Sequence, residues 1–172
     1  GDKNNLTVKD LSFNFADKLK GKISVVVKDF AKPSYSGSLD LEKFNLNQLL
    51  DSLNIAVAAR KNKPLLNNFA ISSNGFSGDM QNISLKGLQI SAGDSLKASF
   101  GTLKVQNFSN PSVSGDVSLP TFNLNQTLDG LGIAVAERKN KSLLNSFAFS
   151  GGFNATPTAA NLSNVKISAG GL

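Results

Sequence analysis

One long stretch of this chain occurs twice. Residues 33–71 align without a gap on residues 111–149, a shift of 78 positions, and 26 of the 39 aligned pairs are identical. The best preserved part reads FNLNQLLDSLNI at Phe44–Ile55 and FNLNQTLDGLGI at Phe122–Ile133. An ungapped match of this quality indicates an internal repeat, so we expect a fold built of units of about 78 residues.

Weaker matches extend the repeat toward both ends. The pattern of Leu6–Phe30 returns at Ile83–Phe108, and part of it returns at Asn161–Gly170. We therefore divide the chain into the last strands of a preceding repeat (1–32), a full repeat (33–110) and a second, truncated repeat (111–172). Because the chain opens within a unit, we expect it to be part of a longer protein, and the lack of an amino-terminal anchor carries no weight.

Apolar and polar residues alternate over most of each unit. Tyr35, Gly37, Leu39 and Leu41 alternate with serine and aspartate, which is typical of a strand with one polar face. Lys9-Asp10 interrupts the first such stretch and indicates a turn or a bulge. The series of strands and short turns favours an antiparallel meander.

A short amphipathic helix is expected once in each unit, at residues 45–54 and 123–131. Asn45 can cap its start, and Asn54 and its counterpart Gly132 tolerate the left-handed conformation found at helix ends. Leucines follow at helical spacing, at Leu46, Leu49, Leu50 and Leu53. A helix this short is marginal alone, so we expect its leucine side to pack on the sheet.

These patterns predict a mainly β protein with short helices (α+β): a curved antiparallel meander or groove of 78-residue repeats, each with one helix. The helix can cover only part of the apolar face. Either a second sheet covers the rest, giving a closed sandwich, or the face is open and needs a ligand. Periodicity does not choose between these two arrangements.

Composition excludes most common catalytic chemistries. The chain has no cysteine and no histidine, which removes disulfides, thiolate nucleophiles, histidine bases and histidine-containing metal sites, but leaves the redox compartment open. Its acidic residues are separated, and no phosphate-binding loop or nucleophile motif is present. We expect no enzyme activity, no cofactor and no metal.

The basic residues raise a second question about partners. The formal net charge is +6, but with one tyrosine and no tryptophan the chain lacks the aromatic clusters typical of nucleic-acid binding. No apolar run approaches the roughly 20 residues of a membrane span. Basic tetrads recur after each helix, either as solvated loops or as contacts to lipid headgroups; the candidates are Arg60, Lys61, Lys63, Arg138, Lys139 and Lys141.

The apolar positions of the strands are the candidate ligand-binding residues. If the face is open, an acyl chain is the natural ligand, since burying it gains about 0.8 kcal/mol per methylene. The candidate lining residues are Phe13, Val25, Tyr35, Leu39, Leu41, Phe69, Ile71, Leu85, Ile90, Leu103, Val113, Val117, Leu119, Phe147 and Phe149.

The string LxLxxFNLNQLLxxLxI at Leu39–Ile55, with its degenerate copy at Val117–Ile133, resembles the repeated signature of the AsmA family of Gram-negative envelope proteins. The resemblance covers about Tyr35–Leu172. It implies a periplasmic part of a protein anchored in the inner membrane, a bridge-like β-groove that carries phospholipid toward the outer membrane. The missing anchor and the high lysine and asparagine content depart from the family pattern.

A different class of function stays open beside the lipid conduit. An exposed sheet edge could bind outer-membrane proteins by strand addition, which would make the chain a structural or chaperone-like scaffold for their assembly. Whether the sheet edge is free or capped would discriminate between the lipid conduit and the scaffold.

Overall fold

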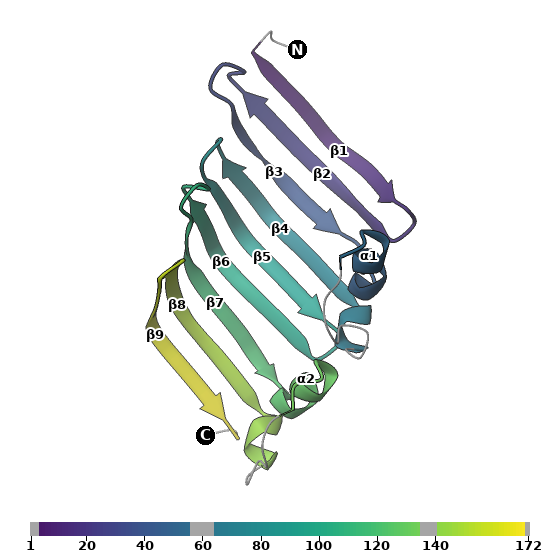
Figure 1. The fold of residues 1–172 in the computed structure, drawn as a ribbon, viewed down its shortest axis with the longest axis vertical. Coiled ribbons are helices and arrows are strands. Elements are labelled where there is room, and N and C mark those ends of the chain that lie inside the picture. The colour runs from purple at the N-terminus through teal and green to yellow at the C-terminus, as the bar shows by residue number, and fades with distance from the viewer. Residues whose placement is uncertain (1–3, 56–63, 135–140, 171–172) are drawn as a thin grey trace.

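The strands form one antiparallel sheet in the order of the sequence. The structure is a computed structural model that describes residues 4–55, 64–134 and 141–170. Nine strands pair in the order β1-β2-β3-β4-β5-β6-β7-β8-β9, each antiparallel to the next, as Figure 1 shows. The strands are β1 (Asn5–Phe15), β2 (Leu19–Lys28), β3 (Ser34–Leu41), β4 (Phe69–Gly78), β5 (Ile83–Ala92), β6 (Leu96–Gln106), β7 (Ser112–Phe122), β8 (Phe147–Thr156) and β9 (Ala159–Ala169). The predicted antiparallel meander is confirmed.

A turn or a bulge is expected at Lys9-Asp10, and the structure has a bulge there. Pairing of β1 with β2 shifts register between Val8 and Leu11, and Asp10 has a left-handed backbone with φ 50°. The backbone N–H of Asp10 donates to Ser24 Oγ at 3.0 Å. Because the bulge adds one residue, Val8 and Leu11 stay on the same face of the sheet although they are three positions apart.

The short helices lie together at one end of the sheet, which we call the helix rim (Figure 1). The α-helix α1 (Leu46–Ser52) and the 3-10 helix η2 (Pro64–Asn67) lie between β3 and β4, and α2 (Leu124–Gly130) and η3 (Lys141–Asn145) lie between β7 and β8. Both α-helices fall inside the predicted ranges of 45–54 and 123–131.

Local signals at the helix ends are confirmed. The Asn45 side chain accepts a hydrogen bond from the backbone N–H of Gln48 at 3.0 Å, and Asn123 caps α2 in the same way. Asn54 and Gly132 follow the helices with φ 55° and 65°. Short side-chain acceptors at the start and left-handed residues at the end are therefore enough to set the limits of each helix.

The expectation that the whole leucine stripe packs on the sheet is wrong. Leu49 is buried, but Leu53 is 46% exposed. The helix α1 lies mainly against η2, and α2 lies against η3. The 3-10 helices thus take the place that was expected for the sheet, and Leu53, the residue that follows α1, stays largely exposed.

The buried apolar residues gather at the helix rim. Among the described residues they are Phe44, Leu49, Leu65, Ala92 and Phe122 there, and Leu88 within β5. No described side chain is fully buried. The sheet is consequently a single layer with a small core at one end, not a sandwich.

Candidate functional site

One face of the sheet is apolar across all of its strands. Directly paired residues of an antiparallel sheet lie on the same face. One row of such pairs runs through Val8, Val25, Gly37, Phe76, Leu85, Leu103, Gly115, Phe153 and Leu162. We call the face that carries this row the apolar face; nothing in the row is polar.

The adjacent row of pairs defines the polar face. It runs through Thr7, Val26, Ser36, Ser77, Ser84, Lys104, Ser114, Asn154 and Asn161. Val26 is its one apolar member. Strand alternation has therefore separated the side chains by polarity over the full width of the sheet.

Register places all of the candidate lining residues on the apolar face, from Phe13 in β1 to Phe149 in β8. Each of them is half-buried, and none is buried. Neighbouring side chains cover them from the sides, and away from the helix rim no second sheet of the described strands lies over them. The face is thus a continuous apolar surface that contacts water.

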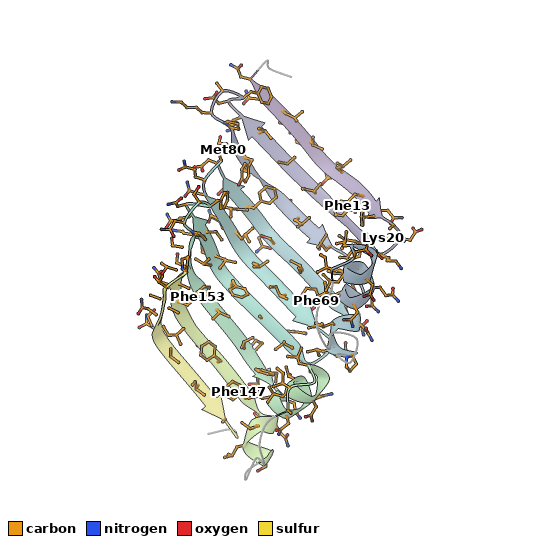
Figure 2. All side chains as sticks on the ribbon, in the orientation of Figure 1. Phe13, Lys20, Phe69, Met80, Phe147 and Phe153 are labelled. Carbon is orange, nitrogen blue, oxygen red and sulfur yellow. The ribbon has the colours of Figure 1, made fainter. Side chains whose placement is uncertain are left out.

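Aromatic rings contact one another across the strands of this face. Tyr35 lies beside Phe76 with 6.3 Å between ring centroids, and Phe100 lies beside Phe153 at 6.4 Å. At the helix rim Phe44 packs edge-on against Phe69 at 5.6 Å. The labelled side chains of Phe69, Phe147 and Phe153 in Figure 2 mark the extent of this surface from the helix rim toward the opposite turns.

The helix rim is held together by amide pairs that sequence reasoning missed. Asn47 Nδ2 donates to Asn67 Oδ1 at 2.9 Å, which ties α1 to η2. Asn125 Nδ2 donates to Asn145 Oδ1 at 3.0 Å and ties α2 to η3 in the same way. These pairs explain the asparagines of the FNLNQ string as structural. The signal that could have found them is the joint repetition of both asparagines at one spacing.

A leucine from each 3-10 helix packs on a glycine that directly follows a strand. Gly93, at φ 59°, lies under Leu65, and an added Cβ would come within 2.7 Å of the Leu65 side chain. Gly170, at φ 70°, lies in the same way under Leu143. Leu65 also faces Gly130 of α2, so the first helix pair contacts the second. A depression of about 760 Å³ lies between η2 and α2.

The polar face combines short hydroxyl side chains with lysines. Its lysines come from five strands: Lys9, Lys20, Lys22, Lys28, Lys86, Lys97, Lys104 and Lys166. Asp116 is turned to the backbone, where its carboxylate accepts hydrogen bonds from the N–H groups of Gly101 and Thr102 at 2.8 and 3.2 Å. Shallow depressions of about 340 to 400 Å³ lie on this face, because serine side chains fill little space.

The basic residues proposed to contact headgroups are not placed. Arg60, Lys61, Lys63, Arg138 and Lys139 lie outside the described residues, and of Lys141 only the backbone, at the start of η3, is described. Within the described ranges no three acidic side chains come together in a way that could hold a metal ion. No described helix is long and apolar enough to cross a bilayer.

Comparison with known proteins finds no relative of this chain. No family model matches the chain, and neither a curated protein nor a solved structure is similar to it.

Proposed function

We propose that the apolar face binds the acyl chains of lipids. The observation that carries the proposal is the open face itself: a sheet of nine strands whose apolar side has no covering layer among the described elements. A soluble monomer rarely exposes a contiguous apolar patch above about 300–600 Å². Nine strands spaced about 4.8 Å apart, each about 30 Å long, give a footprint of roughly 1,300 Å².

The total surface supports the same conclusion. The chain exposes 11086 Å², whereas a compact monomer of this mass is expected to expose roughly 8,100 Å². The excess of about 3,000 Å² is what an uncovered layer leaves in contact with water. Lipid tails fit this face because they are apolar, flexible and need no specific polar partner. Ten buried methylenes would gain about 8 kcal/mol before the cost of ordering the chain.

The proposal extends to architecture. The left-handed residues Asp10, Gly87 and Asn164 follow one another at intervals of 77 positions, and they lie within β1, β5 and β9. We take β1, β5 and β9 as equivalent strands of structural repeats, in agreement with the sequence repeat. In this proposal, further units would extend the sheet, and strand twist would curve it into a groove.

The biological setting is part of the proposal too. The resemblance to the AsmA family supports a non-enzymatic, periplasmic role in an inner-membrane-anchored protein that moves phospholipid toward the outer membrane. The apolar face would be the path of the tails, and the serine- and lysine-rich polar face would contact water.

Neighbouring residues of β5 and β6 offer a matched test. A photo-reactive side chain at Leu85 or Leu103 lies on the apolar face, and one at Ser84 or Lys104 lies on the polar face a single residue away. We expect lipid adducts only from the first pair, and lipid in an organic extract of protein purified without detergent. The proposal fails if the extract contains no lipid and both pairs give the same adducts.

A second candidate function has its own observation. Strand β9 pairs only with β8 among the described strands, and Leu162 and Ile167 are 66% and 64% exposed. A free edge of this kind can accept a strand from another chain, as an assembly scaffold for outer-membrane proteins would require. An Ile167→Pro variant is expected to block strand addition at this edge and to keep lipid on the apolar face. Loss of outer-membrane protein assembly in a variant that still holds lipid would favour the scaffold, and assembly that is unchanged would count against it.

A further inference from the structure

Three large apolar side chains are exposed at consecutive turns opposite the helices. Phe30 is 52% exposed in the turn between β2 and β3, Met80 is 73% exposed between β4 and β5, and Phe108 is 47% exposed between β6 and β7. We call this end of the sheet the turn rim, made by residues 29–33, 79–82 and 107–111. Figure 2 shows Met80 at this end, away from the helices.

An aspartate in each of the first two turns accepts hydrogen bonds from backbone N–H groups of its own turn. The Asp29 carboxylate accepts from the backbone N–H groups of Ala31 and Lys32 at 3.1 and 3.3 Å. The Asp79 carboxylate accepts from those of Gln81 and Asn82 at 2.8 and 2.9 Å. These amides need no water, which removes much of the penalty for moving a turn into a less polar medium.

Hydrogen bonds between turns fix their positions. The backbone N–H of Phe108 donates to the carbonyl of Gln81 at 3.1 Å, and the N–H of Asp29 donates to the carbonyl of Asn4 at 2.9 Å. The backbone at Phe108 and next to Phe30 is thus fixed by pairing with a neighbouring segment of the chain. A partner would have to order the side chains but not the turns that carry them.

The spacing of the apolar tips indicates the kind of partner. Consecutive turns of this rim are two strands apart, about 10 Å, with polar residues between them. A protein partner needs a contiguous complementary patch, whereas a bilayer takes up separate apolar tips and hydrates the polar groups between them. Lys28 and Lys32 flank Phe30 and suit lipid phosphates. The negative carboxylates of Asp29 and Asp79 offset the charge of these lysines. We therefore expect the apolar side chains to contribute more to bilayer binding than the charged ones.

We propose that the turn rim inserts Phe30, Met80 and Phe108 into the interface of a lipid bilayer, at the boundary between headgroups and acyl chains. This contact is distinct from lipid on the apolar face and does not depend on it. If both exist, the rim would bring the ends of the strands, and with them the apolar face, to the surface from which lipid is taken or to which it is given.

The absence of tryptophan from the chain allows a direct test. Met80→Trp and Phe108→Trp each add a single tryptophan to the turn rim, and Leu53→Trp adds one to the helix rim at 46% exposure, close to the 47% of Phe108. The probe is vesicles of equal amounts of phosphatidylcholine and phosphatidylglycerol. We expect a blue shift and quenching by brominated acyl chains for the two turn-rim variants only. No shift for them, or equal quenching of all three, would overturn the proposal.

A second measurement separates this contact from the proposed function. Replacing Phe30, Met80 and Phe108 together by serine is expected to weaken vesicle binding by about tenfold for each side chain. The variant should keep the circular dichroism spectrum and the lipid adducts of a photo-reactive Leu85. Vesicle binding unchanged by the replacement would refute the role of the rim. A native rim that binds vesicles in a chain whose photo-reactive Leu85 gives no lipid adduct would instead count against the apolar face and leave the rim contact standing.

Discussion

Gly37 shows at the scale of one residue how closely the strands approach on the apolar face. A Cβ at Gly37 would lie 1.9 Å from the carbonyl oxygen of Ser24 and 2.7 Å from the Phe76 ring. At Gly75, close by on β4, the nearest atom would be 3.5 Å away. We expect Gly37→Ala to destabilise the fold by about 1–3 kcal/mol, because backbone and ring must move, and Gly75→Ala to have little effect. Urea unfolding measures both; equal losses would contradict the close approach.

Asp79 provides a pH-dependent contribution to stability. Hydrogen bonds from the Gln81 backbone first, and then from the side chain and backbone of Asn82, hold the pKa of the Asp79 carboxyl below its usual value. A carboxyl with a lowered folded-state pKa stabilises the fold at pH values above its unfolded pKa of about 4, and the contribution is lost as the pH falls through the folded value.

The corresponding measurement compares the native chain with Asp79→Asn, which keeps the shape and removes the charge. We expect the native chain to be the more stable of the two at neutral pH, and the difference to shrink as the pH falls below about 4. A difference that is the same at pH 7 and at pH 2 would rule out the ionised carboxylate as its source.

At the scale of elements, the two 3-10 helices have equivalent sequences but different surroundings. Leu65 of η2 is 8% exposed because Gly130 of α2 lies beside it, while Leu143 of η3 is 37% exposed. We expect Leu65→Ala to cost about 2–4 kcal/mol and Leu143→Ala clearly less, since only the first leaves a cavity. Thermal or urea unfolding of the two variants provides the comparison. Equal costs would mean that the contact with α2 adds nothing.

At the scale of the whole molecule, a single-layer sheet should respond weakly to denaturant. The unfolded chain exposes roughly 26,000 Å², so unfolding exposes about 15,000 Å² here against about 18,000 Å² for a compact protein of the same mass. Because the urea m-value scales with this area, we expect it to be about one sixth below that of compact proteins of equal length. Protein at micromolar concentration, freed of lipid, is the sample to measure.

A normal m-value would contradict the open sheet. Self-association through the apolar face could produce such a value, and sedimentation of the same sample would reveal it as a dimer. Lipid-loaded protein provides the control, since an occupied face has no reason to pair with another copy.

Much of the local structure was predictable because it depends on neighbours in the sequence. The alternation at Tyr35–Leu41 predicted a strand with one polar face, and Lys9-Asp10 predicted a turn or a bulge. Asn45 marked a helix start through its side-chain acceptor, and Gly132 marked a helix end through its left-handed backbone. Each of these features involves residues only a few positions apart, so a short pattern contains the information.

The packing of the helices was not predictable in this way. The leucine stripe of α1 has the right spacing for a sheet contact, yet Leu53 is exposed and Asn47 meets Asn67 of η2 instead. That partner is 20 positions away. Periodicity says which side chains share a face of the helix, but not which element comes to lie against that face.

The sequence by itself determined the strands, their polarity and the spacing of equivalent positions, because alternation and capping are local properties. Only the tertiary structure decided that the sheet is one open layer with its small core at the helix rim. Closing a sandwich or leaving the face open gives the same alternation along each strand. The choice depends on contacts between distant strands, which no single strand records.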